Sequence, residues 1–94
     1  MNYKNITYKN KNLIRINSKK LDNILKNYKK YNGLVIYIAP INLRIDESNY
    51  WMSPFELEIS DYMDYYDYIN KINEIRFYNC IDELGRYLKY YIEM

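Results

Sequence analysis

The segment that most constrains the fold is an apolar run at residues 34–39, Leu-Val-Ile-Tyr-Ile-Ala. Its six residues do not alternate with polar ones and three of them are β-branched, a pattern typical of a β-strand buried on both faces. A segment this short cannot cross a bilayer, which takes about 20 residues. The run therefore predicts the middle strand of a sheet, with other parts of the chain covering both faces.

The residues before this run predict a hairpin followed by a helix. Ile6–Tyr8 and Leu13–Ile16 are short β-prone runs separated by four polar residues, which favours a hairpin. The helix begins after the N-cap Ser18 and stops at Asn32-Gly33. Its apolar positions recur at helical spacing: Leu21, Ile24, Leu25 and Tyr28.

The residues after Pro40 predict further strands and helices. Alternation at Ile41–Ile45 and Phe55–Ile59 indicates two strands with one exposed face each, and the exposed face of the second is acidic. A helix capped by Ser60 follows, although the high Tyr content leaves a strand possible there. The apolar positions of this helix are Tyr62, Tyr65, Ile69 and Ile72. Ile75–Tyr78 is then a short strand. A last helix is capped by Asn79, with apolar positions Ile81, Leu84, Leu88 and Tyr91.

Helices that interleave with strands over a chain of 94 residues indicate one α+β or α/β domain covering 1–94. We expect a mixed, mostly antiparallel sheet of about 4–6 short strands with about 2–3 helices packed on it. The expected order is β-β-α-β-β-β-α-β-α.

Charge is divided between the two halves of the chain. Residues 1–45 contain ten Lys and Arg and one acidic residue, Asp22, which is a net charge of +9. Residues 46–94 contain eleven acidic residues and four Lys and Arg, which is a net charge of −7. An asymmetry of this kind indicates an electrostatically guided contact with a partner.

The composition excludes several kinds of chemistry. The chain has no His and a single Cys, Cys80, which removes disulfides within the chain, Cys/His zinc sites and histidine base catalysis. A small buried apolar side chain is the simplest interpretation of Cys80. We therefore expect no enzymatic activity, no metal and no cofactor. Residues 1–5 lack the apolar core of a signal peptide, so we expect a cytoplasmic protein that enters no membrane.

An acidic, tyrosine-rich segment is the first candidate site. Tyr supplies rigid contact area at low entropic cost, and a ridge of carboxylates can imitate a run of phosphates. Solvated acids beside a buried tyrosine stripe explain the same segment without a partner. The candidate residues are Glu56, Glu58, Asp61, Asp64, Tyr65, Tyr66, Asp67 and Tyr68. Tyr50 and Trp51, in the connection before this segment, are either a further interface anchor or a cap on the core.

The basic half holds an alternative candidate surface. The helix dipole favours lysines at the end of the first predicted helix, but it disfavours Lys19 and Lys20 in the first turn. A solvated face in a Lys-rich chain is the simplest interpretation. The candidate residues are Lys4, Lys9, Lys11, Lys19, Lys20, Lys26 and Lys30. Tyrosines among them can stack on the bases of a single strand, and these are Tyr3, Tyr8, Tyr28 and Tyr31.

Ile, Asn, Lys and Tyr, whose codons are rich in A and T, make up 51 of 94 residues, which points to a low-GC bacterium or to a phage or mobile element within one. The leading hypothesis is a stoichiometric inhibitor, either an anti-CRISPR-like blocker of a host defence nuclease or an immunity protein that neutralises a toxin. Its acidic tyrosine-rich residues would act as a nucleic-acid mimic in a basic groove of the partner. The alternatives are a small nucleic-acid-binding protein that uses the basic half, and a homo-oligomer, such as a homodimer, held by the opposite charges.

Overall fold

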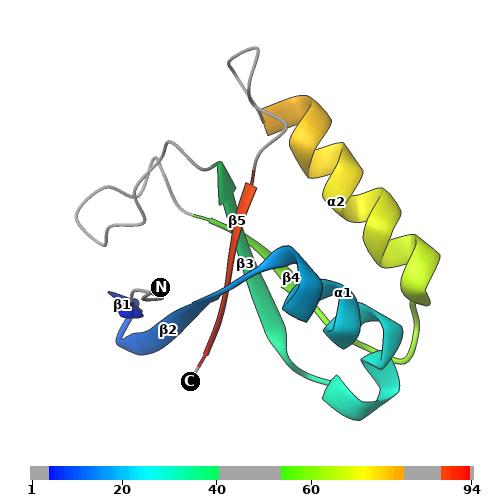
Figure 1. Ribbon diagram of the computed structural model, residues 1–94, viewed down its shortest axis with the longest axis horizontal. Helices are drawn as coiled ribbons and strands as arrows, with labels where there is room; N and C mark the ends of the chain where they lie inside the picture. The colour runs from blue at the N-terminus through cyan, green and yellow to red at the C-terminus, as the bar shows by residue number, and fades with distance from the viewer. Residues whose placement is uncertain (1–4, 41–53, 80–87, 94) are drawn as a thin grey trace.

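The chain forms an α+β fold in which two α-helices pack on a five-stranded antiparallel sheet (Figure 1). The computed structural model describes residues 5–40, 54–79 and 88–93. This architecture confirms the predicted fold class. The elements in chain order are β1 (Asn5–Tyr8), β2 (Lys11–Ile16), α1 (Ser18–Lys26), the 3-10 helix η1 (Tyr28–Tyr31), β3 (Val35–Pro40), β4 (Phe55–Glu58), α2 (Tyr65–Asn79) and β5 (Leu88–Glu93).

The last strand of the chain lies at the centre of the sheet. The strand order is β1-β2-β5-β3-β4, and every neighbouring pair is antiparallel. The helical connections β2-α1-β3 and β4-α2-β5 each join two parallel strands that have one antiparallel strand between them, which is a split β-α-β arrangement. The predicted middle strand, β3, therefore lies inside the sheet, but β5 holds the central position because it fills the gap that the first crossover leaves.

Two turns position the elements at the amino-terminal half. The β1–β2 hairpin is confirmed, and its turn residues Lys9 and Asn10 have φ of 49° and 64°, the signature of a type I′ turn. Gly33 has φ of 91°, a conformation that glycine adopts without steric cost. Its N–H donates to the Ile59 carbonyl over 2.7 Å. This turn directs the chain from η1 into β3.

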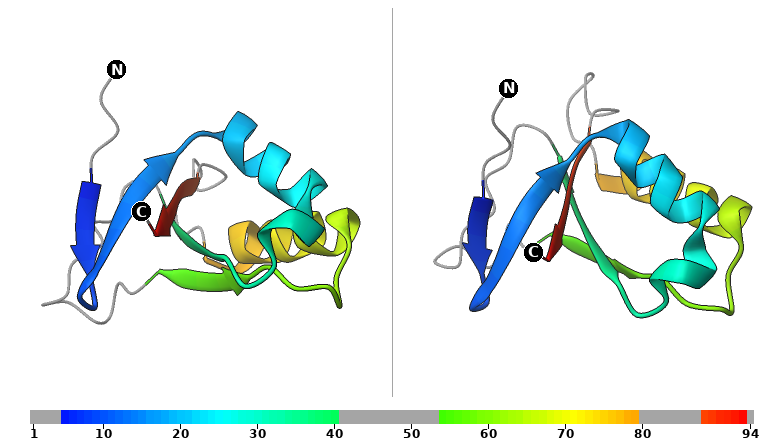
Figure 2. Two further views of the ribbon diagram at one scale, coloured as in Figure 1. Left: turned by 90° about the horizontal axis from the view of Figure 1, so that it is seen from below. Right: turned by 60° about the horizontal axis from the view of Figure 1, so that its bottom comes forward.

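Both helices cover the same face of the sheet (Figure 2), and a single core lies beneath them. Full burial of a large apolar side chain contributes roughly 1.5–3 kcal/mol, so this core holds the helices on the strands. Its buried residues are Ile16, Leu21, Ile24, Leu25, Ile36, Ile38, Leu57, Ile59, Tyr68, Ile72, Ile75, Leu88 and Tyr90.

A second, smaller cluster lies on the helix-free face of the sheet, made by Tyr8, Leu13, Tyr37 and Tyr91. The rings of Tyr8 and Tyr37 meet edge to face, with centroids 6.1 Å apart. Side chains of β3 alternate between the two clusters, and residues 36–39 are all buried. The prediction that this strand is buried on both faces is confirmed.

Several predicted elements near the carboxyl end are wrong. Ile75–Tyr78 is not a strand, because α2 runs on to Asn79. The buried positions Tyr68, Ile72 and Ile75 continue one helical stripe, which a prediction based on short apolar runs divides in two. Leu88 and Tyr91 belong to β5 and not to a helix. Their spacing fits a helical stripe, but in β5 they point to opposite faces of the sheet.

Some predictions concern residues outside the described ranges. These are the strand Ile41–Ile45, the anchors Tyr50 and Trp51, Cys80, the positions Ile81 and Leu84 of the last predicted helix, and Tyr3 and Lys4. The predicted cap of that last helix, Asn79, is wrong, because Asn79 is the last residue of α2. Of the helices that the structure describes, none is long and apolar enough to span a membrane.

Candidate functional site

The loop between β4 and α2 is held in place by Tyr68, which belongs to the helix. The Ser60 N–H donates to Tyr68 Oη over 2.8 Å, and the Tyr68 hydroxyl donates to the Ser60 carbonyl over 2.6 Å. Tyr68 is fully buried, and its ring contacts that of Tyr28, with centroids 5.9 Å apart. The loop therefore begins at a point fixed to the core.

The amino end of α2 is closed by two aspartates. The Asp67 N–H donates to Asp64 Oδ1 over 3.0 Å, and the Asp64 N–H donates to Asp67 Oδ2 over 2.9 Å. This reciprocal pair is a capping box, with Asp in place of the usual Ser/Thr and Glu. The predicted cap, Ser60, lies outside the helix. Its Oγ accepts the Tyr62 N–H over 3.2 Å, so it forms a side-chain turn in the loop.

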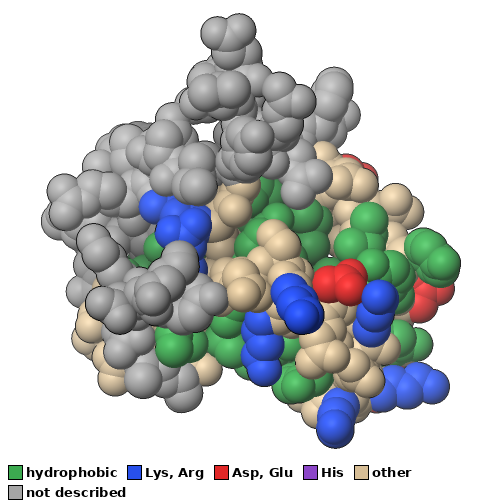
Figure 3. All heavy atoms as spheres, viewed as in Figure 1, with side chains coloured by type: hydrophobic (Ala, Val, Ile, Leu, Met, Phe, Trp, Pro, Cys, Tyr) green, Lys and Arg blue, Asp and Glu red, His purple; other side chains and the backbone are tan. Residues whose placement is uncertain are grey.

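Two tyrosines of this region point into solvent. Tyr62 is 96% exposed and Tyr66 is 73% exposed, whereas large aromatic side chains are normally packed in cores or interfaces. Asp61, Asp64 and Asp67 beside them are also exposed. We call these five residues the acidic tyrosine surface. Figure 3 shows hydrophobic and acidic side chains at the right edge of the molecule, where α2 begins in Figure 1.

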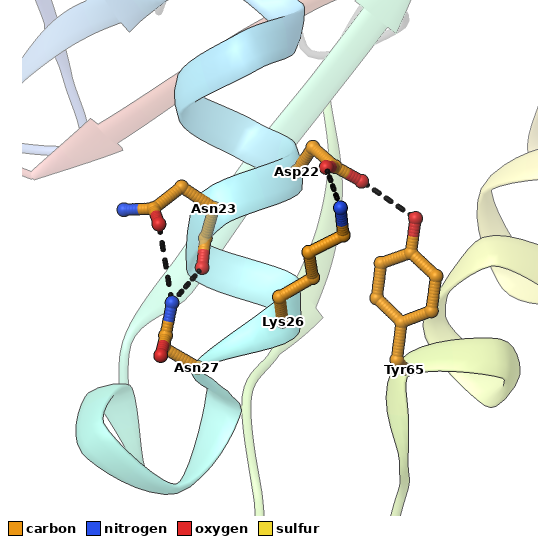
Figure 4. Close-up of polar contacts among 5 residues, drawn as sticks. All are labelled: Asp22, Asn23, Lys26, Asn27 and Tyr65. Carbon is orange, nitrogen blue, oxygen red and sulfur yellow. Dashed lines mark hydrogen bonds and ion pairs between the residues drawn. The ribbon is translucent and has the colours of Figure 1, made fainter.

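Tyr65 connects the two helices (Figure 4). Its hydroxyl donates to Asp22 Oδ1 over 2.6 Å, and Lys26 Nζ lies 3.0 Å from Asp22 Oδ2. Hydrogen bonds from Tyr65 and Lys26 lower the pKa of the Asp22 carboxyl. The same bond raises the pKa of Tyr65, because ionising its hydroxyl would remove a donor from a carboxylate. The one acidic residue of the basic half thus joins α1 to α2.

The predicted acidic site is therefore divided by the fold. Asp61, Asp64, Asp67 and Tyr66 lie together in the acidic tyrosine surface, Tyr65 lies between the helices, and Tyr68 is in the core. Glu56 and Glu58 pair across the ladder with Tyr37 and Val35, which belong to the cluster on the helix-free face. Paired residues share a face of the sheet, so these two glutamates point away from the helices.

The sequence pattern predicted the wrong tyrosine for the core. The predicted core stripe included Tyr62, which is the most exposed large apolar side chain of the described chain. It left out Tyr68, which has no exposure. The error follows from the predicted helix start at Ser60, since α2 begins at Tyr65. Asp64 and Asp67 have the spacing of a capping box and mark the true start, but Asp61 and Asp64 have the same spacing, so this signal alone does not locate it.

Three of the four tyrosines predicted to stack on bases lie within the described chain, and all three pack inside the fold. Tyr8 is only 2% exposed, and Tyr28 and Tyr31 pack against the main core. Lys9 Nζ lies 5.3 Å from the Tyr8 ring centroid. Lys11 donates to Tyr37 Oη over 3.4 Å, and this bond raises the pKa of Lys11.

Four other lysines on α1 and η1 are exposed, and within the described chain they have no carboxylate partner. We call them the lysine surface: Lys19, Lys20, Lys29 and Lys30. Figure 3 shows basic side chains spread over this part of the molecule. The N-cap of α1 is Asn17, whose Oδ1 accepts the Lys20 N–H over 2.8 Å. The predicted cap, Ser18, is the first helical residue.

Among the residues that the structure describes, no three His, Cys, Asp or Glu side chains are grouped so that they could hold a metal ion. No protein-family model, curated protein or solved structure matches this chain.

Proposed function

We propose that this chain is a non-enzymatic binding protein whose acidic tyrosine surface docks on a basic surface of a protein partner. The observation that carries the proposal is the exposure of Tyr62 and Tyr66, at 96% and 73%, among three carboxylates. Tyr is enriched at the energetic centres of interfaces, where its ring is buried and its hydroxyl finds a partner.

The carboxylates and the tyrosine rings of this surface contribute to different steps of binding. Carboxylates accelerate the encounter with a positively charged partner and orient it. The rings then lose their exposed area to the partner, which slows dissociation. The loop that carries Tyr62 is already ordered by Ser60, Tyr68 and the capping box, so little entropy is lost when a partner binds.

A basic groove that binds nucleic acid is the partner that this charge pattern fits. The exposed carboxylates at the amino end of α2 would occupy such a groove in the place of phosphates. The protein then acts as a stoichiometric blocker of a nuclease or a toxin, of the anti-CRISPR or immunity type, in the host cytoplasm if a phage encodes it.

The test is affinity capture from a lysate of the source organism, with three baits. We expect the wild type and a Lys29→Ala/Lys30→Ala control to retain the same stoichiometric protein, and Tyr62→Ala/Tyr66→Ala to lose it. Loss of two central tyrosines should weaken binding at least about 30-fold, which corresponds to roughly 2 kcal/mol. The captured protein should bind nucleic acid less tightly when the wild-type chain is added. Equal capture by all three baits contradicts the proposal.

Lys19 and Lys20 support a second candidate function. They lie in the first turn of α1, where the helix dipole disfavours positive charge, so the lysine surface is a candidate for binding nucleic-acid phosphates. Such binding should weaken steeply with salt and should be lost when these lysines are replaced by Glu. It should not respond to Tyr62→Ala/Tyr66→Ala. Binding of a labelled duplex at two salt concentrations distinguishes it from the first proposal.

A further inference from the structure

β4 is an edge strand whose outer side is unoccupied within the described chain. It ends the strand order after β3, and no other described strand pairs with it. In Figure 2, β4 runs along one border of the sheet. An edge strand offers a row of backbone donors and acceptors to another chain.

The backbone hydrogen bonds show which residues of β4 face outward. The Ile59 N–H donates to the Leu34 carbonyl over 2.8 Å, so this residue turns its N–H towards β3. Hydrogen-bonded and non-hydrogen-bonded pairs alternate along an antiparallel ladder. The backbone N–H and C=O groups of Leu57 and Phe55 therefore also point towards β3. Those of Glu56 and Glu58 point away from the sheet.

The side chains of β4 give this edge a charge and an apolar end. Glu56 and Glu58 are exposed on the helix-free face, and no ion pair in the described chain holds either of them. On the opposite face, Leu57 is buried and Phe55 is 38% exposed. An added strand would thus meet two carboxylates on one face and an accessible aromatic ring on the other.

We propose that the outer edge of β4 accepts an extended segment of the partner as an added strand, and that this segment carries Lys or Arg at alternate positions. Opposite charges at directly paired positions stabilise an antiparallel ladder, and like charges destabilise it. Pairing of β4 with β4 of a second copy would set Glu against Glu, so self-association is disfavoured. The edge is continuous with the acidic tyrosine surface, since only Ile59 separates β4 from Ser60, which begins that loop.

This inference takes one premise from the proposed function, namely that the partner is positively charged. The mode of binding is β-strand addition, in which main-chain hydrogen bonds give affinity and alternate side chains give specificity. Its test therefore uses a synthetic strand in place of the unidentified partner.

The experiment is an NMR titration of the full chain, labelled with nitrogen-15, with an octapeptide of alternating Lys and Val. We expect the amide signals of Glu56 and Glu58 to shift, and their hydrogen exchange to slow at least about tenfold, because each N–H gains an acceptor. An octapeptide of alternating Glu and Val should leave both amides unchanged. Shifts at other residues only, or equal shifts with both peptides, overturn the proposal.

Two variants of Glu58 separate the contribution of its backbone N–H to peptide binding from that of its carboxylate. Glu58→Thr removes the carboxylate and keeps the N–H, and we expect the affinity for the Lys/Val peptide to fall about threefold. Glu58→Pro also removes the outward N–H, which an edge strand tolerates, and should weaken binding at least about tenfold. Equal affinities of the two variants contradict a backbone contact.

An N-methylated form of the Lys/Val peptide, which lacks backbone donors, repeats the comparison without changing the protein. We expect it to bind at least about tenfold more weakly, whether or not Glu58→Pro folds. Tyr62→Ala/Tyr66→Ala should bind the unmodified peptide as the wild type does. If that variant loses partner capture and still binds the peptide, both proposals are supported independently. If it still captures the partner, the proposed function fails. If the wild type does not bind the peptide, the proposal for the β4 edge fails.

Discussion

The amino ends of the two helices are opposite in charge and opposite in their relation to the helix dipole. At α2, Asp64 and Asp67 close a capping box, and negative charge is favourable at this end of a helix. At α1, the cap is the neutral Asn17, and Lys19 and Lys20 follow in the first turn. The aspartates thus have a structural role, whereas the first-turn lysines oppose the local electrostatics.

Charge alone therefore does not identify the working surface. Two of the three aspartates of the acidic tyrosine surface, Asp64 and Asp67, already stabilise the amino end of α2. What sets this end apart is exposed apolar area, since Tyr62 and Tyr66 face solvent. The corresponding region of α1 buries its apolar residues, Leu21, Ile24 and Leu25, in the core.

The largest expected effect separates the anchored tyrosine of α2 from an exposed one. Tyr68→Ala should lower the free energy of unfolding by about 3–5 kcal/mol, because it empties a fully buried site and leaves the Ser60 backbone groups without partners. Tyr66→Ala should change it by less than about 0.5 kcal/mol. Urea denaturation measures both. A comparable loss in Tyr66→Ala would mean that this ring serves stability and not binding.

Removing either helix cap should change the free energy of unfolding less than removing Tyr68 does. Asp64→Ala should cost about 1–2 kcal/mol, because it removes the Oδ1 that accepts the Asp67 N–H and a negative charge at the amino end of α2. Asn17→Ala should cost about 1 kcal/mol, since it removes one bond to the Lys20 N–H. The check is urea denaturation, with Asp61→Ala as a matched aspartate outside the box. If Asp61→Ala costs as much as Asp64→Ala, the capping explanation fails.

Reversing charge at the amino end of α1 should increase stability. Lys19→Glu and Lys20→Glu should each raise the free energy of unfolding by about 0.3–1 kcal/mol at low salt, because they complement the helix dipole. The gain should shrink in high salt, where surface electrostatics are screened. Lys29→Glu, in η1 beyond the carboxyl end of α1, is the control and should show no such gain. A loss of stability in the first two variants would show that these lysines have a structural role.

The smallest effect concerns the contact between the helices and depends on pH. Because the folded pKa of Asp22 is lowered, its stabilisation is present above the ordinary range for Asp and is lost as pH falls through the lowered value. The stability difference between wild type and Tyr65→Phe should therefore be largest near neutral pH and shrink in acid.

The raised pKa of Tyr65 predicts a second loss of this contact at high pH. Stabilisation is complete below the ordinary pKa of Tyr and disappears as pH rises through the raised value. Denaturation of wild type, Tyr65→Phe and Asp22→Asn across the pH range checks both limbs. A difference between wild type and Tyr65→Phe that stays constant from acid to alkaline pH would contradict the assigned hydrogen bond.

Much of the fold could be predicted from the sequence where the pattern was local and unambiguous. The hairpin, the doubly buried β3 and the half-buried β4 were correct because each has one consistent periodicity. The first helix was correct in its buried positions Leu21, Ile24 and Leu25, but its cap is Asn17 and it ends at Lys26, with the 3-10 helix η1 in place of the predicted last turn. α2 was correct at Ile69 and Ile72 but began at the wrong residue, because Ser60 and Asp64 are both suitable caps. Leu88 and Tyr91 satisfy a helical stripe as well as a strand, and the sequence contains no signal that decides between them.

The class of the fold and the exclusion of histidine chemistry follow from the amino-acid sequence, because both depend on composition and local periodicity. The position of β5 between β2 and β3 depends on the folded chain, because packing selects strand partners that are far apart in the sequence. The folded chain also determines which tyrosines are exposed. Because α2 begins at Tyr65, Tyr62 lies in the loop before the helix, and that start depends on hydrogen bonds made by Ser60, Asp64 and Tyr68 in the folded chain.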